Sequence, residues 1–319
     1  MNLRDIVRRV LLGPSLPNEY VCTTPDWISK PLHVYVWRNE LPVDVTNFQL
    51  LLGYKPLTIG LAVTDPGLAG WLTRRDEIQL TFATDVTSAP AASLVLKRAA
   101  EWRMGDANLI VFTGQRGEHQ FLTGFYRFTN RCYEFLRPYR QEYGSMKEAD
   151  YNQVRIAYSV PRNISVMSVG QGDLFNFFPT DLQGSVGSRF FVGSLRVGGK
   201  ACGQVEHLKH VVISSIGVDN FKDVYALAKN HMNDLRSPAN FSIADVRSEQ
   251  WQLPIPKQAI SYKELLWKSS WDVGIHRVHF YEIVNERVLD GAPFPLAHVH
   301  RYYVQWRLRN KLSTKYLLR

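Results

Sequence analysis

DLFNFFPTDLQGSVGSRFFVGSLRVGGKACGQ, which runs from Asp173 to Gln204, is the most informative stretch of this 319-residue chain. A loop rich in Pro, Thr, Asp and Gly leads into an apolar strand over Phe190 to Leu195, and a glycine pair then opens a helix that continues to Leu208. Loops held by a rigid scaffold are where binding residues concentrate. The stretch therefore predicts a ligand-binding loop on a β framework.

Hydrogen-bond donors are dense in this loop, and they include the side chains of Asn176, Thr180, Ser185, Ser194, Arg196 and Lys200. The backbone N–H groups of Gly198 and Gly199 can approach an anion where the helix dipole also favours negative charge. This set predicts a phosphate site, and a plain polar loop between two strands is the alternative interpretation. A P-loop is excluded, because Ala201 follows Lys200 where Ser or Thr is required.

The order of these features resembles the FMN-binding core of the flavin reductase-like family, which has a split β-barrel fold. Two later stretches extend the resemblance. Gly274-Ile275-His276 opens an expected strand, HRVHFYEIV, and Pro295-Leu296-Ala297-His298 leads into an expected closing strand, HRYYVQWRL. The resemblance covers Val154 to Leu308, which is about half of the chain.

The resemblance implies roles for individual residues. Asn176 and Thr180 would contact the flavin or its ribityl chain, and Ser194, Leu195 and Arg196 would hold the phosphate end, with Lys200 adding charge. His276 would lie where the nicotinamide or another substrate approaches the flavin ring, and would be the catalytic residue. An ordinary barrel histidine is the alternative interpretation, because the sequence gives His276 no acid or base partner.

The function that the resemblance implies is hydride transfer from NAD(P)H to a flavin, with FMN expected in preference to FAD. The chain has no Rossmann fingerprint, so the pyridine nucleotide would bind transiently over the flavin. A non-catalytic flavin-binding electron carrier, sensor or assembly module is the alternative. No feature of the sequence separates NADH from NADPH or identifies the electron acceptor.

The first half of the chain repeats parts of this pattern. Asn47 in VTNFQ is placed much as Asn176 in LFNFF, and Gly117-Glu118-His119 opens QFLTGFYRF much as Gly274-Ile275-His276 opens its strand. Similarity at domain scale indicates duplication, and chance similarity between two β-rich halves is the alternative. We also expect a helix over Ser88 to Arg103, where alanines are frequent.

We therefore expect a mainly β chain with flanking helices, made of two tandem split barrels. Residues 1–145 would form a degenerate N-terminal domain that has lost its phosphate site, and residues 146–319 the FMN-binding domain. The two copies would form a pseudo-dimer within the chain, and a further homodimer is possible.

Composition narrows the partners. The formal net charge is +9, but basic residues occur in no run longer than a pair such as Arg8-Arg9, so no nucleic-acid-binding stripe is expected. No apolar run could span a bilayer, so no membrane partner is expected. The three cysteines, Cys22, Cys132 and Cys202, give no disulfide framework, and we expect reduced thiols in a cytoplasmic protein with Cys202 as a small buried residue.

A metal site is not expected. His276 and His279 would point to opposite faces of one strand, whereas His298 and His300 would share a face. Two histidines on one strand do not make a set of convergent ligands. The chain also lacks a G-x-S-x-G elbow for hydrolase chemistry.

Overall fold

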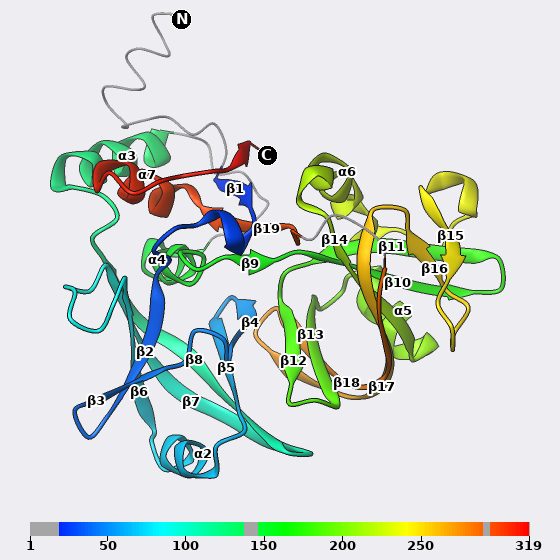
Figure 1. Cartoon of the computed structure of the whole chain (residues 1–319), viewed down its shortest axis with the longest axis horizontal. Helices are drawn as coiled ribbons and strands as arrows, with labels where there is room; N and C mark the ends of the chain where they lie inside the picture. Colours follow the sequence, from blue (N-terminus) through cyan, green and yellow to red (C-terminus); the bar gives the residue numbers. More distant parts are fainter. Residues whose placement is uncertain (1–18, 137–145, 290–293, 319) are drawn as a thin grey trace, which may run out of the picture.

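The computed structural model describes residues 19–136, 146–289 and 294–318. Strands dominate these residues and short helices flank them, which confirms the predicted mainly β fold. Two seven-stranded antiparallel sheets curve into two barrels that lie side by side (Figure 1). We call the barrel of strands β2 to β8 the first half and the barrel of strands β10 to β18 the second half.

The first half is ordered β3-β2-β6-β7-β8-β5-β4 across its sheet. Asp65 begins the helix that follows β5, because its carboxylate accepts from the backbone N–H of Leu68 at 2.5 Å. Its elements are β2 (His33–Arg38), β3 (Leu41–Asp44), β4 (Gln49–Tyr54), β5 (Leu57–Val63), α2 (Pro66–Thr73), β6 (Glu77–Ala83), β7 (Ala92–Met104) and β8 (Ala107–His119).

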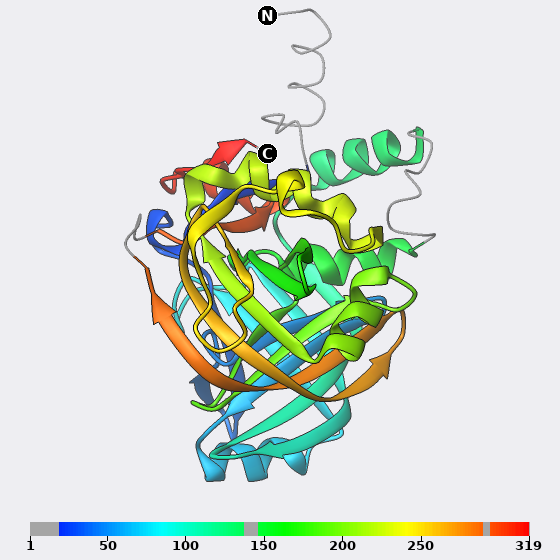
Figure 2. The ribbon, with the colours of Figure 1, turned by 90° about the vertical axis from the view of Figure 1, so that its right-hand side faces the viewer.

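The second half has the order β11-β10-β14-β17-β18-β13-β12, which matches the first half strand for strand. Its helix also follows the fourth strand of the barrel. Its elements are β10 (Ser165–Gln171), β11 (Leu174–Thr180), β12 (Gln183–Val186), β13 (Phe190–Arg196), α5 (Lys200–Leu208), β14 (His210–Ile216), β17 (Ala259–Val273) and β18 (His276–Val288). The strand and helix predicted from Phe190 to Leu208 are confirmed. Figure 2 shows how the long β17–β18 hairpin curves around this barrel.

Further elements join the two ends of the chain above the barrels (Figure 1). A four-stranded sheet has the order β20-β1-β19-β9, with β1 (Tyr20–Thr23), β9 (Arg162–Asn163), β19 (Ala297–His300) and β20 (Leu317–Leu318). The helices α3 (Gly124–Leu136), α4 (Glu148–Ala157) and α7 (Arg301–Arg309) lie beside the first half. Side chains of α4 and α7 belong to the first hydrophobic core, so this core reaches beyond residue 145. The domain boundary at 145 stays a prediction.

The second half carries its own additions between β14 and β17. They are α6 (Phe221–Ala226), a hairpin of β15 (Ile243–Arg247) and β16 (Pro254–Pro256), and the short 3-10 helices Val218–Asn220, Leu227–Met232 and Pro238–Asn240. One more 3-10 helix, Pro25–Trp27, follows β1.

Three local predictions are wrong. The stretch Ser88 to Arg103, predicted as a helix, is mostly strand β7, whose first residues alternate between buried and half-buried. HRYYVQWRL, predicted as the closing strand, is helix α7, which begins where the His300 ring accepts from the N–H of Tyr302 at 3.1 Å. QFLTGFYRF, predicted as a strand, runs into helix α3.

The two halves meet through a reciprocal contact of turns. In the second half, the β17–β18 turn donates the N–H of Ile275 to the carbonyl of Lys55, in the β4–β5 turn of the first half, at 3.1 Å. In the first half, the β7–β8 turn at Asp106 packs on Gly187 in the β12–β13 turn of the second. The β12–β13 turn corresponds to the β4–β5 turn, and the β17–β18 turn corresponds to the β7–β8 turn. Each contact therefore joins the last hairpin turn of one half to the β4–β5 type of turn of the other half.

Apolar side chains fill the space between these contacts. Trp102 and Trp271 hold corresponding places, each two residues before the end of its hairpin strand, and their rings lie 5.1 Å apart. The surrounding buried cluster takes residues from both halves, among them Leu52, Leu109, Val192 and Val278. A contact of like with like is the geometry of a two-fold dimer, here formed within one chain.

The glycine of the β17–β18 turn allows us to test this interface. A Cβ at Gly274 would overlap the Lys55 carbonyl oxygen, and its φ of +59° also disfavours other residues. Gly274→Ala should lower the free energy of unfolding by about 2 to 4 kcal/mol, from backbone strain plus overpacking. Gly172→Ala is the matched control, because Gly172 has the same φ and nothing within 4 Å; it should cost about 1 kcal/mol. Equal losses in urea unfolding would contradict the role of this contact.

Candidate functional site

A groove of about 300 Å³ opens between the halves at one end of the second barrel. The first half supplies one wall with β4, the segment of Pro161 and β9 supplies another, and the second half supplies the rest. The residues that line it are Gln49, Leu50, Leu51, Pro161, Arg162, Asn163, Ser165, Asp181, Gln183, Gly184, Ser185, Phe191, Ile213, Ser215, Ser261, Tyr262 and Lys263. Its volume lies at the lower end of the roughly 300 to 1,000 Å³ that is usual for small-molecule sites.

The groove is polar where the first half is apolar. Strand pairing aligns Ser165, Ser215 and Ser261 in one row across β10, β14 and β17. The row in the corresponding position of the first half is Val34, Phe82 and Ala92, and all three are buried in the first core. One row further along, Lys263 stands where the first half has Leu94. Ser165 already accepts from Nε2 of Gln183 at 3.1 Å, whereas Ser215 and Ser261 are half-buried at the groove, and these two hydroxyls make the row a candidate ligand site.

Helix α4 explains why the first half has no groove at this place. Its residues Val154 and Ile156 join the first core, where Ile156 packs against Leu94 and Gly117. Gly114 is also without a side chain, and Gln153 fills that space. The end of the first barrel is therefore capped, whereas the end of the second is open.

A buried guanidinium forms one side of the groove. Arg162 donates from Nε and Nη2 to the carbonyl of Ala157 at 3.0 and 2.8 Å, and from Nη2 to Oε1 of Gln49 at 2.9 Å. Burial lowers the pKa of Arg162 to about 10, so it remains a cation at neutral pH. Gln49 is itself buried, and its Nε2 has no hydrogen-bond partner among the described residues. This amide is a donor available to an acceptor in the groove.

The carboxylate of Asp181 at the edge of the groove is already engaged. Its Oδ2 accepts from Tyr158 Oη at 2.6 Å and from His298 Nε2 at 2.7 Å, and Tyr225 Oη lies 2.6 Å from the other ring nitrogen of His298. Burial alone would raise the pKa of Asp181, but the hydrogen bonds from His298 and Tyr158 outweigh it and lower the pKa. Asp181 is therefore an ionised structural acceptor, which leaves donors in excess around the groove.

The groove residues include neither Asn176 nor Lys200. Asn176 is fully buried and donates to Oε1 of Gln204 at 2.8 Å and to the carbonyl of Asn230 at 3.0 Å. Lys200 forms an exposed ion pair with Asp234. Both side chains fix the segment that follows α6 to the barrel, and the structure does not bring them to the groove.

Four more of the predicted binding residues, Thr180, Ser194, Leu195 and Arg196, also lie outside the groove lining, whereas Ser185 of the predicted donor set lies within it. Thr180 accepts from the N–H of Leu182 at 3.3 Å, and Ser194 lies 3.4 Å from the carbonyl of Arg277. Leu195 is buried in the barrel core, and Arg196 is exposed at the end of β13. The groove meets the predicted loop only at Asp181 to Ser185.

His276, the predicted catalytic residue, is 2% exposed at the start of β18. Its ring meets Tyr54 of the first half edge to face at 4.3 Å, and its Nδ1 has no hydrogen-bond partner among the described residues. Burial, with the nearby charge of Arg196, lowers the pKa of His276 to about 4, so the ring is neutral at physiological pH. It does not line the groove.

The internal alignment of the two halves needs a correction. Gly274-Ile275-His276 forms the β17–β18 turn, and the corresponding β7–β8 turn is Gly105-Asp106-Ala107, with both glycines at φ near +60°. Gly117-Glu118-His119, the segment expected there, lies at the far end of β8. Asn47 lies in the β3–β4 turn and not within a strand as Asn176 does. The second residue of this turn is thus an acid, Asp106, in the first half only, and the third is a histidine, His276, in the second half only.

Cys202 is buried, as predicted, and is not activated. Burial raises the pKa of its thiol to about 11. Its Sγ lies 3.6 Å from Nε2 of His279, while Trp267 donates its indole N–H to Nδ1 of the same ring at 3.1 Å. A neutral ring that accepts at Nδ1 carries its proton on Nε2, so it cannot take the proton of the thiol.

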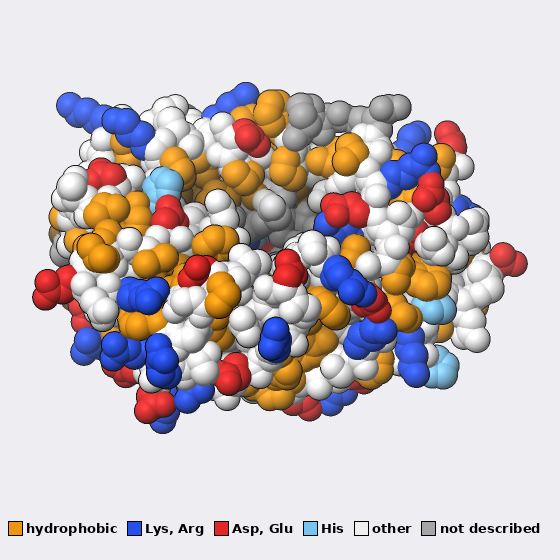
Figure 3. Space-filling model, turned by 60° about the horizontal axis from the view of Figure 1, so that its bottom comes forward, with side chains coloured by type: hydrophobic (Ala, Val, Ile, Leu, Met, Phe, Trp, Pro, Cys, Tyr) orange, Lys and Arg blue, Asp and Glu red, His pale blue; other side chains and the backbone are white. Residues whose placement is uncertain are grey.

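Two features of the described residues concern metal binding and membrane insertion. Over residues 19–136, 146–289 and 294–318, no three His, Cys, Asp or Glu side chains converge as metal ligands would. Within the same ranges, no helix combines the length and the apolar character needed to cross a bilayer. Basic and acidic side chains are interspersed on the face shown in Figure 3.

Comparison with known proteins gives similarity only at the level of structure. No family model matches the chain, and no curated protein matches it. The NADH:FAD oxidoreductase SgcE6 of Streptomyces globisporus C-1027 is similar with a TM-score of 0.41 and 14% identity, over 48% of this chain and 90% of that one. BorF, the flavin reductase component of a bacterial tryptophan halogenase, is similar with a TM-score of 0.42 and 16% identity, over 53% and 98%. These proteins are of the kind that the sequence resembles, and each spans about half of this chain.

The depressed pKa of His276 makes stability depend on pH. As the pH falls below the ordinary value of 6.5, the unfolded chain takes up a proton that the folded chain resists until about pH 4. Stability from this site is therefore complete above pH 6.5 and is lost between 6.5 and 4. Between pH 5.5 and 4.5, the free energy of unfolding of the wild type should fall by roughly 1 kcal/mol more than that of His276→Phe. Urea unfolding of both proteins at both pH values tests this. Equal losses of stability would show that the proton taken up on unfolding of the wild type does not bind at His276.

Proposed function

We propose that the chain binds a flavin, FMN in preference to FAD, in the groove between its halves and acts as an oxidoreductase. The support is the row of Ser165, Ser215 and Ser261, which replaces the apolar row of the first half. A flavin has carbonyl acceptors along one ring edge and a phosphate at the end of its side chain. A groove whose polar groups are mainly donors suits both ends.

The groove residues divide into two kinds of donor. Nε2 of Gln49 is a buried amide donor without a partner among the described residues, and it suits a ring carbonyl. Lys263 is 24% exposed and pairs with Glu286, so its ammonium is held at the groove while part of its charge faces outward. Lysine is a common point-charge partner of phosphate, and the serine hydroxyls can complete the shell. These are the residues we assign to the cofactor.

The proposed reaction is hydride transfer from NAD(P)H to the flavin, which would supply the redox chemistry when bound. The chain's part is to exclude water and orient the ring from both halves. Its free cysteines are compatible with a reducing cytoplasmic location, which belongs to the same proposal. The identical strand orders support an ancestral duplication, and the fused halves would act as the dimer, with or without a second chain.

One observation favours a second candidate, a non-catalytic flavin-binding carrier or sensor. His276, which the resemblance places beside the nicotinamide, is packed against Tyr54 and does not line the groove. At about 300 Å³, the groove also has little space for a second ring above a flavin. Reduction by a pyridine nucleotide separates the two functions.

An absorption experiment tests the proposal. The purified chain, mixed with FMN and freed of excess, should retain the flavin band, because the groove supplies its donors without rearrangement. Anaerobic NADH or NADPH should then bleach the band if the chain is a reductase. A retained band that does not bleach identifies the carrier, and a band that is lost on removal of excess FMN would contradict flavin binding as a resident cofactor.

Exchange of a groove residue for its counterpart in the first half tests the site. Lys263→Leu introduces the residue found at the corresponding Leu94, and loss of one charged hydrogen bond should weaken FMN binding about tenfold or more. Lys268→Leu is the matched control, since Lys268 lies on the same strand and forms a similar ion pair with Glu282 at 2.8 Å, outside the groove. Fluorescence titration measures both. Equal weakening would show a general effect of charge rather than a groove contact.

A further inference from the structure

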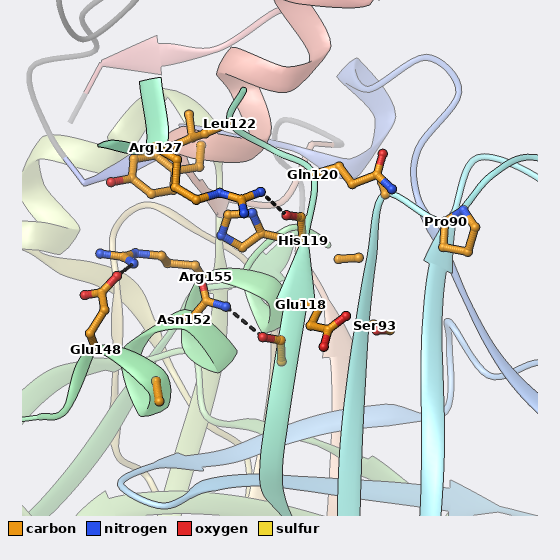
Figure 4. Close-up of a pocket in the computed structure, with 15 residues that line it drawn as sticks. Pro90, Ser93, Glu118, His119, Gln120, Leu122, Arg127, Glu148, Asn152 and Arg155 are labelled. Atoms are coloured by element: carbon orange, nitrogen blue, oxygen red, sulfur yellow. Dashed lines mark hydrogen bonds and ion pairs between the residues drawn. The ribbon is translucent and has the colours of Figure 1, made fainter. Parts of the chain in front are cut away.

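A second cavity, of about 770 Å³, lies in the first half on the other side of α4. Its walls come from the start of β7, the end of β8, and helices α3, α4 and α7. Figure 4 shows Arg127 beside His119 and Arg155 pointing toward Glu148, with Ser93 and Pro90 on the strand side. The flavin proposal does not use this cavity, and the two can be tested separately.

Two arginines line the cavity, one buried and one exposed. Arg155 has a side chain that is only 3% exposed, stacks over Tyr151 and Tyr302 at 4.2 and 5.0 Å, and pairs with the half-exposed Glu148. Arg127 donates to the carbonyl of His119 at 3.0 Å, and no carboxylate pairs with it among the described residues. One cation is thus neutralised by a carboxylate and the other is not.

The remaining acid in the lining lies toward solvent. Glu118 is 73% exposed and lies 3.7 Å from Arg116, which does not line the cavity. Glu118 therefore pairs with Arg116 outside the cavity and does not neutralise Arg127. Two guanidinium groups and two carboxylates thus line the cavity, and the guanidinium of Arg127, which no carboxylate pairs among the described residues, is the group that suits an anionic ligand.

His119 adds a neutral, flat surface. Its Nδ1 accepts from the N–H of Phe121 at 3.3 Å, so a neutral ring carries its proton on Nε2, and the ring already forms a hydrogen bond with the side chain of Asn152. Burial, followed by the charges of Arg155 and Arg127, lowers the pKa of His119 to about 3, so the ring is neutral at physiological pH. Leu122, Pro90 and the ring of Tyr302 extend the apolar part of the wall.

We propose that this cavity binds a flat heteroaromatic molecule that carries one oxyanion, a phosphate or a carboxylate. The oxyanion pairs with Arg127, whose planar guanidinium can donate two parallel hydrogen bonds. Asn152 lies on the same wall, where its amide is fixed by the carbonyl of Gly117 at 2.8 Å. The ring of the ligand packs on the apolar surface between Pro90 and Tyr302.

Calorimetric titration of the whole chain with two pairs of probes tests the proposal. Adenosine 5′-monophosphate is compared with adenosine, and nicotinate with nicotinamide, so that each pair differs in its oxyanion. In at least one pair, the anion should bind about tenfold tighter than its neutral partner, the gain expected from one charge-assisted contact. The pair that responds identifies the ligand as a phosphate or a carboxylate.

The variant Arg127→Gln assigns that binding to the cavity. It removes one charge from an exposed helix position and should weaken the responding anion about tenfold. Arg103→Gln is the matched control, because it removes the same charge from the end of β7 that is opposite to the lining residues Ala92 and Ser93, and it should leave affinity unchanged. Circular dichroism shows whether each variant is folded.

Three results would overturn the proposal. They are no binding of either anion at millimolar concentration, equal binding to the wild type and Arg127→Gln, and binding of inorganic phosphate as tight as that of adenosine 5′-monophosphate. The last would show that the apolar wall contributes nothing.

Discussion

The contact between the hairpin turns of the two halves is the constraint on which the candidate site depends. Gly274 seats the β17–β18 turn on Lys55, and Gly187 seats the opposite turn, at Asp106, in the same way. These contacts place β4 of the first half against β12 of the second, where Gln49 and Leu50 become a wall of the groove. A barrel by itself would have an open end there. Because the partner is covalently attached, this wall is present at any protein concentration.

Because the two halves are parts of one chain, their two ends need not be identical. In a homodimer, a Ser to Val change in the row of Ser165 would appear at both sites at once. Here Val34, Phe82 and Ala92 are core, under a helix that supplies its own apolar residues, while Ser165, Ser215 and Ser261 are polar at the corresponding place. The buried area gained under α4 stabilises one half. The polar row in the other half contributes less to the core and is available to a ligand.

The sequence predicts the framework better than the site, for physical reasons. The strand Phe190 to Leu195 and the helix that ends at Leu208 are local features, set by an apolar run and by glycines, and both are confirmed. In contrast, α7 buries Tyr302, Tyr303 and Val304 in succession, so its composition has no helical stripe and resembles a strand. The serine row could not be predicted, because the three serines lie in three strands far apart in the sequence and only the strand pairing brings them together. The hydrogen bond between Arg162 and Gln49 could not be predicted either, because the two residues are 113 apart in the sequence.

Helix α4 contributes to both candidate sites. Its Glu148, Asn152 and Arg155 line the cavity of the first half, and its last carbonyl, on Ala157, accepts both hydrogen bonds that orient Arg162 in the groove. Arg162 in turn fixes Oε1 of Gln49 and leaves Nε2 of that amide directed to other partners. A displacement of α4 therefore cannot alter the cavity alone, since it also moves the acceptor that holds Arg162. The helix that closes the first barrel is for this reason also part of the support of the second.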